Sequence, residues 1–173
     1  MIRTGLNSIL TLSVIGALCL TPIAAADSDE TVSAAAALDL RPGDEADMCD
    51  PATPQIRATV NNVTAEGILL VEVYSDDASN FLEKEARLRR ARVAAEDGTQ
   101  VVCLNIDGPG RYAVASYHDI DGDRKLDKKW NRLPKEPFAL STNPRLKLRK
   151  PRFEEAAFDA GETGADIVLN LRD

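Results

Sequence analysis

The chain has 173 residues and a formal net charge of −7, with 28 acidic residues against 21 Lys and Arg. This length corresponds to one ordinary domain and is sufficient for a hydrophobic core. The single histidine, His118, excludes zinc sites that are built from several histidines. It also leaves no catalytic triad beyond the neighbouring pair His118 and Asp119.

The first 26 residues are predicted to be a cleaved signal peptide. Arg3 is the only charged residue before Asp27, and an apolar run over residues 9–20 follows it. Ala24 and Ala26 then provide the small residues that a signal peptidase requires. The apolar run is too short to cross ~30 Å of hydrocarbon, which disfavours a transmembrane helix. We therefore expect export to the periplasm or outside the cell, with no transmembrane segment in the mature chain.

Two cysteines remain in the mature chain, Cys49 and Cys103. In an oxidising compartment an even pair predicts a disulfide, and two free buried thiols are the alternative. The bond would stabilise the fold by about 4 kcal/mol in the chain-entropy model. Because Cys103 alternates with the apolar residues 102, 104 and 106, it would strap the preceding segment across the outside of a sheet.

The mature chain divides into two parts. Residues 27–54 are predicted to be an acidic, Ala-rich tether, because they lack sustained apolar periodicity. Residues 55–173 are predicted to form a β-sandwich domain, because apolar residues recur at every second position in several short runs. These runs are QIRATVNNV, GILLVEVYS, TQVVCLNI, RYAVASYHD and ADIVLNLRD, with a further strand expected within residues 87–95.

The predicted fold class is all-β. Short strands separated by Gly and Pro turns, without alternating helices, indicate an antiparallel β-sandwich of the immunoglobulin-like or prealbumin-like kind. One short helix is expected near the C-terminus, where Pro151 precedes Phe153, Ala157 and Phe158.

The stretch HDIDGDRKLD is the candidate metal site. Asp119, Asp121 and Asp123 match the first, third and fifth positions of a calcium loop, and Asp127 matches the ninth. Arg124 stands where such a loop usually has glycine, and the glutamate that would complete the loop is absent. Two interpretations stay open: a weak Ca²⁺ site, and a turn in which the aspartates hydrogen-bond their own backbone.

Positive charge is concentrated in residues 124–152, which hold eleven Lys and Arg against two acids. This stretch could bind an anionic component of the envelope, such as lipid headgroups or polysaccharide. It could equally receive the acidic tether or form a solvated face. Nucleic acid is not expected, because the aromatic residues of a base-stacking platform are missing. The candidate anionic-surface patch consists of Arg145, Lys147, Arg149, Lys150 and Arg152.

Three stretches, GRYAVASYHDIDGDRKLD, PKEPFALSTNPR and PRFEEAAFDAG, resemble the signature blocks of an uncharacterised bacterial exported family, catalogued as domain of unknown function twenty-one forty-one. The resemblance extends over residues 55–171 and implies a small secreted β-sandwich without implying an activity. Arg124 and Pro137 stand where the family usually has glycine, and the acidic tether is an addition. The matching positions are His118, Asp119, Asp121, Asp123, Lys125, Leu126, Asp127, Pro134, Glu136, Phe138, Ser141, Asn143, Phe153, Ala156 and Phe158.

Two functions from different classes follow as hypotheses. The favoured one is a non-enzymatic binding or structural module of the envelope, with the aspartate loop and the PKEPFALSTNPR segment at its binding edge. The alternative is a hydrolase of envelope glycans, which would need a concave pocket that holds two carboxylates, with Trp130 on its wall. The carboxylates of the hydrolase would come from Asp119, Asp121, Asp123 and Glu136. The binding loop of the favoured module would consist of His118, Lys125, Glu136, Ser141 and Asn143.

Overall fold

A computed structural model describes residues 38–76, 79–126, 129–130, 134–145 and 147–173. The predicted signal peptide, residues 27–37 of the predicted tether and Asp127 lie outside these residues, and the expectations for them stay predictions.

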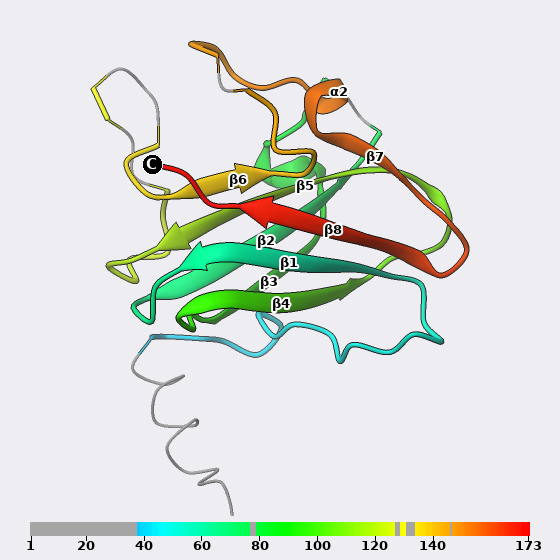
Figure 1. The fold of residues 1–173 in the computed structure, drawn as a ribbon, viewed down its shortest axis with the longest axis horizontal. Coiled ribbons are helices and arrows are strands. Elements are labelled where there is room, and N and C mark those ends of the chain that lie inside the picture. The colour runs from blue at the N-terminus through cyan, green and yellow to red at the C-terminus, as the bar shows by residue number, and fades with distance from the viewer. Residues whose placement is uncertain (1–37, 77–78, 127–128, 131–133, 146) are drawn as a thin grey trace, which may run out of the picture.

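The described chain contains eight strands (Figure 1). Two short helical turns accompany them, the 3₁₀ turn η1 (Lys84–Ala86) and α2 (Phe153–Ala156). Among the described residues no helix has both the length and the apolar character needed to cross a membrane. The strands are β1 (Gln55–Val63), β2 (Ile68–Ser75), β3 (Arg87–Ala94), β4 (Gly98–Asn105), β5 (Gly110–Asp119), β6 (Phe138–Leu140), β7 (Ala157–Ala160) and β8 (Gly164–Asn170).

The strands form two facing sheets, which confirms the predicted all-β sandwich. One sheet has the order β4-β1-β8 and the other the order β3-β2-β5-β6, with β7 pairing beside β6 on β5. All strand pairs are antiparallel except β1 with β8, which run parallel. The chain crosses from β7 in one sheet to β8 in the other through the turn at residues 161–164.

The main core lies between the two sheets and follows the alternation in the sequence. In β4, Val102 and Leu104 are buried in this core, whereas Val101 on the opposite face is 42% exposed. β1 alternates in the same way, as expected for a sheet buried on one face, whereas β2 is buried on both faces and contributes only every second residue to this core. The innermost residues include Ile56, Ala58, Val60, Leu69, Val71, Val73, Val114 and Leu169.

A second apolar cluster covers part of the outer face of the larger sheet, where α2 packs. Phe81 contacts the Tyr74 and Phe153 rings edge-on, at centroid distances of 5.3 and 5.8 Å. The expected helix is therefore present near the C-terminus, but it ends at Ala156. Ala157 and Phe158 belong to β7 instead, because their backbone pairs with the first half of β5. At these two residues the backbone hydrogen bonds to β5 replace those of a further helical turn.

Residues 38–54, called the strap below, cross the side of the sandwich where both sheets end (Figure 1). β3 is the last strand of one sheet and β4 the last strand of the other. The strap bonds to both, since Arg92 N donates to Asp44 O (2.6 Å) and Asp47 N donates to Cys103 O (2.9 Å). It therefore covers two strand edges that would otherwise present unpaired backbone groups.

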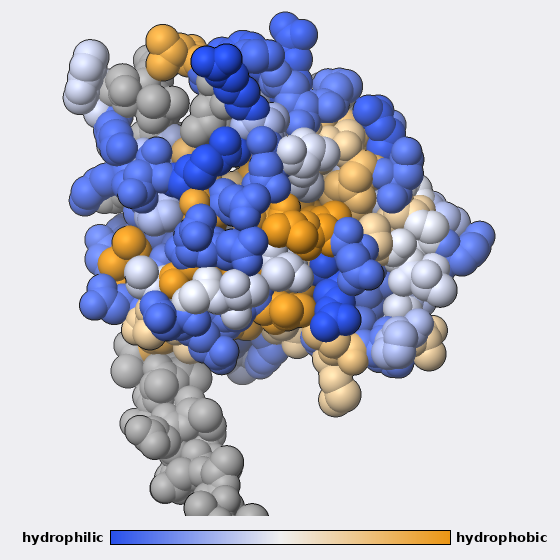
Figure 2. Space-filling view, viewed as in Figure 1, coloured by the Kyte–Doolittle hydropathy of each residue, from blue (hydrophilic) through white to orange (hydrophobic). Residues whose placement is uncertain are grey.

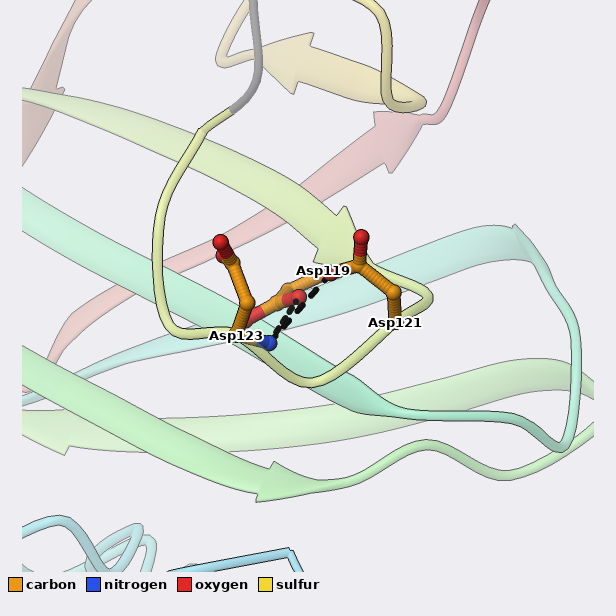
Figure 3. A group of neighbouring side chains, drawn as sticks. All are labelled: Asp119, Asp121 and Asp123. Carbon is orange, nitrogen blue, oxygen red and sulfur yellow. Dashed lines mark hydrogen bonds between the residues drawn. The ribbon is translucent and has the colours of Figure 1, made fainter.

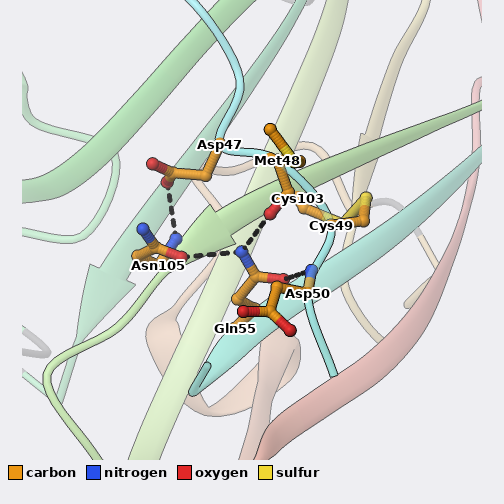
Figure 4. Close-up of a disulfide and its surroundings, with 7 residues drawn as sticks. All are labelled: Asp47, Met48, Cys49, Asp50, Gln55, Cys103 and Asn105. Carbon is orange, nitrogen blue, oxygen red and sulfur yellow. Dashed lines mark hydrogen bonds between the residues drawn. A yellow bond between two sulfur atoms is a disulfide. The ribbon is translucent and has the colours of Figure 1, made fainter. Parts of the chain in front are cut away.

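The predicted disulfide between Cys49 and Cys103 is formed, with Cα atoms 5.3 Å apart (Figure 4). It holds the strap on the outer face of β4, as the alternation around Cys103 indicated. Gln55 reinforces the attachment, because its side chain accepts from Asp50 N (2.8 Å) and donates to Met48 O (2.7 Å). The strap is thus fixed at its C-terminal half by one covalent bond and several backbone contacts.

The N-terminal half of the strap is held by a buried carboxylate. Asp44 is 2% exposed and accepts from the guanidinium groups of Arg90 (2.9 Å), Arg92 (3.1 Å) and Arg124 (2.8 Å). Burial by itself would raise the pKa of Asp44, but the hydrogen bonds from Arg124, Arg41 N and Arg92 outweigh burial and lower the pKa to about 2.

We predict that replacing both disulfide cysteines by Ala lowers the free energy of unfolding by about 4 kcal/mol, because the unfolded chain regains the entropy of a loop closed over 54 residues. Urea denaturation measures this loss. The reduced wild-type protein should match the variant, and reductant should leave the variant unchanged. Equal stability of the oxidised wild type and the variant would contradict the prediction.

We predict that Asp44→Asn costs about 3 kcal/mol above pH 5, because it leaves three arginines without their counter-ion. The folded pKa of Asp44 lies below its unfolded value, so its contribution is present above pH ~4 and disappears as the pH falls towards 2. The difference in free energy of unfolding between the wild type and the variant should therefore decrease by about 2 kcal/mol as the pH falls from ~4 to ~2. A constant gap in denaturation curves would contradict the prediction.

Candidate functional site

The aspartate turn, residues 119–125, begins at the last residue of β5 and is closed by its own carboxylates (Figure 3). Asp119 accepts from the backbone N–H of Asp123 (3.2 Å) and of Arg124 (2.7 Å). Asp121 accepts from the same Asp123 N–H (3.3 Å), and Asp123 accepts from Lys125 N (2.8 Å). The bonds from Asp123 N to Asp121 and from Lys125 N to Asp123, each two residues apart, are those of Asx turns. Asp119 reaches further, to the fourth and fifth residues after it. The turn is therefore closed by its own side chains.

The same three aspartates are also close enough to share a cation. One carboxylate oxygen from each of Asp119, Asp121 and Asp123 lies within 4.8 Å of the other two. Asp119 is 1% exposed, and burial raises its pKa, as does Asp121, while hydrogen bonds from Arg124 N and Gly122 N act in the opposite direction. Ca²⁺ prefers six to eight oxygen ligands, so a bound ion would need further oxygens besides these three.

Two backbone features shape this turn. Arg124 has φ +68°, a left-handed conformation that is unfavourable for a residue with a side chain. Its guanidinium compensates by bonding the strap at Asp44 and Asp39 O. On the other side, Gly67 lies so close that an added Cβ would be 2.0 Å from Asp119 O. The turn is therefore held between the strap and the β1–β2 connection.

His118 faces the inside of the sandwich, on the opposite face of β5 from Asp119. Its side chain is 1% exposed, and Nε2 lies 2.6 Å from Glu66 O, which makes Nε2 the protonated nitrogen. Nδ1 is buried and has no hydrogen-bond partner among the described residues. His118 thus fixes the β1–β2 connection and is not presented to solvent.

Ser141 and Asn143 connect the end of β6 to its neighbours. Ser141 is 1% exposed, and its hydroxyl accepts from Val114 N (2.8 Å) and donates to Ala156 O. Asn143 donates to Val168 O (2.7 Å) and accepts from Asn170 N (2.8 Å). Of the other predicted binding-loop residues, Glu136 is 7% exposed, whereas Lys125 is exposed beside Asp123.

The later part of the connection that enters β6 and the connection that leaves β6 carry exposed cations. Both of these segments lie on the side of the molecule away from the strap (Figure 1), whereas the start of the first connection, with Arg124, lies against the strap. Their hydrophilic surface is visible at the top of Figure 2. We call this side the basic edge; its described, exposed cations are Lys129, Lys135, Arg145, Lys147, Arg149, Lys150 and Arg152.

Part of the basic edge is organised by acidic partners on adjacent elements. Glu155 in α2 accepts from Lys147 (2.7 Å) and Arg149 (2.7 and 2.8 Å), and these hydrogen bonds lower the pKa of Glu155. Lys150 pairs with Glu83. The acidic strap bonds Arg90, Arg92 and Arg124 instead, so within the described residues its Asp44 is not a counter-ion of the basic edge.

A hydrolase that uses two carboxylates needs both of them in one pocket, and two hollows of the described surface are candidates for such a pocket. The larger, about 370 Å³, lies beside the disulfide and includes Asp50, Arg57 and Asp166. A much smaller one, about 10 Å³, includes Arg149 and Glu155. Neither hollow contains an aspartate of the turn, and Trp130 is 97% exposed rather than on a pocket wall.

We predict that about 10 mM Ca²⁺ leaves the melting temperature within about 1 °C of its value in EDTA, because backbone N–H groups already occupy the aspartate oxygens. Thermal unfolding with Mg²⁺ as control measures this. A site with Kd ~0.1 mM would instead add about 2.7 kcal/mol and raise the melting temperature by several degrees. Loss of such a rise in Asp121→Ala/Asp123→Ala would establish the turn as a calcium site.

Comparison with known proteins places this chain in a family. No curated protein and no solved structure matches the chain. A family model described as "Uncharacterized protein conserved in bacteria (DUF2141)" matches residues 59–168, which include the aspartate turn, β6 and α2. This match covers more than half of the chain and agrees with the resemblance seen in the sequence. The chain therefore belongs to the DUF2141 family of uncharacterised bacterial proteins.

Proposed function

We propose that the protein is an exported, non-enzymatic β-sandwich module that binds an anionic component of the cell envelope through its basic edge. The observation that carries this proposal is the separation of charge between two opposite sides of one small domain. The predicted signal peptide and the disulfide support an oxidising compartment outside the cytoplasm.

The two sides differ in charge. The basic edge has seven described, exposed cations, although the whole chain carries −7. The described strap has five acids, Asp39, Asp44, Glu45, Asp47 and Asp50, against Arg41, and Arg90, Arg92 and Arg124 neutralise its Asp44. The strap side therefore has no surplus of cations, so an anionic surface attracts the basic edge preferentially, which favours a single orientation on approach.

The placement of the cations also supports binding. They lie on connections at the margin of a rigid sandwich, which is where such folds carry recognition residues. Ser141 and Asn143 hold the start of the connection after β6 against β5 and β8, so its backbone is anchored before the cations begin. A ligand would therefore meet exposed cations on an ordered base.

The non-enzymatic part of the proposal is supported by how the carboxylates are used. Asp119 and Asp123 accept backbone hydrogen bonds within their own turn, and Glu155 forms ion pairs with Lys147 and Arg149. General acid–base chemistry on a glycan needs a pair of carboxyl groups that face a shared pocket. The larger described hollow holds the carboxylates of Asp50 and Asp166, but Asp50 accepts hydrogen bonds from Ala52 N and the Thr53 hydroxyl.

We predict that the protein is retained at neutral pH and low salt on a matrix of sulfated polysaccharide, despite its net negative charge. Lys129→Glu/Arg145→Glu should weaken binding at least tenfold, because each charge near an anionic surface contributes about 1 kcal/mol. Elution by a salt gradient measures the change.

The matched control is Arg57→Glu/Arg89→Glu, which alters the net charge equally at exposed positions on β1 and β3. It should elute like the wild type. Equal weakening of both double variants would mean that net charge alone governs retention. Failure of the wild type to bind would reject the basic edge as a binding surface for anions.

A further inference from the structure

Two large apolar side chains of the basic edge are almost fully exposed to solvent. Trp130 is 97% exposed and Leu148 is 90% exposed, and elsewhere among the described residues only Met48 on the strap, at 87%, is comparable. A single exposed apolar residue is ordinary. The setting of Trp130 and Leu148 is unusual, because Lys129 precedes Trp130, and Lys147 and Arg149 flank Leu148.

The two side chains belong to connections on the same side of the fold. Trp130 lies in the connection that enters β6, and Leu148 lies in the one that leaves it. β6 has only three residues. The connection that leaves it and the later part of the connection that enters it extend away from β6 on the side opposite the strap (Figure 1). Figure 2 shows hydrophobic atoms among strongly hydrophilic ones at the tip of the second connection.

We propose that the basic edge docks on an anionic lipid bilayer, with Trp130 and Leu148 inserted among the headgroups. This inference rests on the proposed function and names its ligand class. Indole rings favour the interface between headgroups and acyl chains, and a leucine inserted there is removed from water. The surrounding Lys and Arg bind lipid phosphates and hold both side chains at that depth.

The apolar pair distinguishes a bilayer from a soluble polyanion. A polysaccharide or a free phosphate could neutralise the cations, but it would leave Trp130 and Leu148 in water. A bilayer satisfies the charges and the apolar groups at the same time. The strap side has no such surplus of cations, so the basic edge is the side that faces the lipid.

Trp130 is the only tryptophan of the chain and is therefore a built-in reporter of insertion. The experiment uses the chain from Asp27 onward, which includes every described residue and lacks the apolar signal segment. Emission spectra are recorded with vesicles of phosphatidylcholine alone and with vesicles that contain equal parts of phosphatidylglycerol. Flotation of the same mixtures measures binding, and each titration is repeated at about 0.5 M salt, where surface charge is screened.

We expect the emission of Trp130 to shift to shorter wavelength only with the phosphatidylglycerol vesicles, and high salt to weaken binding. Leu148→Ser should reduce partitioning about tenfold, in line with the loss of one inserted leucine. Met48→Ser is the matched control, because Met48 is 87% exposed on the strap and should stay in water. Its partitioning should equal that of the wild type.

Three other outcomes are distinguishable. Binding to the anionic vesicles without a spectral shift, and with no effect of Leu148→Ser, would overturn insertion and leave the proposed function standing. Binding to the sulfated polysaccharide but not to the vesicles would do the same and identify a soluble polyanion as the ligand. Binding to neither would overturn both proposals.

Discussion

The buried contact between Asp44 and three arginines determines how this molecule is organised. β3 alternates between Ala91 and Val93, which face the core, and Arg90 and Arg92, which face outward. Burial and the neighbouring arginines lower the pKa of Arg90, which reflects crowded positive charge on that face. A carboxylate is needed there, and breaking such a buried pair is costly. The strap supplies that carboxylate, so its course across the sandwich is set by charge as much as by the disulfide.

Several features depend on this placement of the strap. Arg124 accepts a strained backbone conformation in the aspartate turn while its side chain bonds Asp44. Two open strand edges are covered on one side, and the crowded arginines there are neutralised by Asp44. The cations of the two β6 connections are left on the other side. The resulting polarity is the basis for proposing that the protein binds an anionic surface.

The sequence predicted most of the fold because alternation is a local property. The neighbours of Val102 and Leu104 in the sequence indicate which face each occupies, and the two cysteines beyond the predicted signal peptide favoured a disulfide over two free thiols. The parallel pairing of β1 with β8 was not foreseen, because the alternation in ADIVLNLRD fits either direction equally well. The end of α2 was misplaced for a related reason: Phe158 suits both an amphipathic turn and a strand, and only the distant β5 decides between them.

The candidate site was less predictable, because its contacts join residues far apart in the chain. Asp44 lies in a segment whose composition resembles a disordered tether, yet it is among the most buried acids described. The available signal was the pair Arg90 and Arg92 on one face of an edge strand, which implies a counter-ion. For Ser141 and Asn143 the sequence marked the correct segment. It could not reveal that both side chains bond the neighbouring elements.

The position of β1 has a consequence for the order in which this domain can fold. β1 is the first strand of the described chain, and it lies between β4 and β8, the last described strand. Contacts between Val60 and Leu169 therefore join residues more than a hundred positions apart. Such topology slows folding, because a large loop must close before the contact forms. Until residues 164–170 are available, one edge of β1 is open. An open strand edge of this kind favours aggregation of partly folded chains.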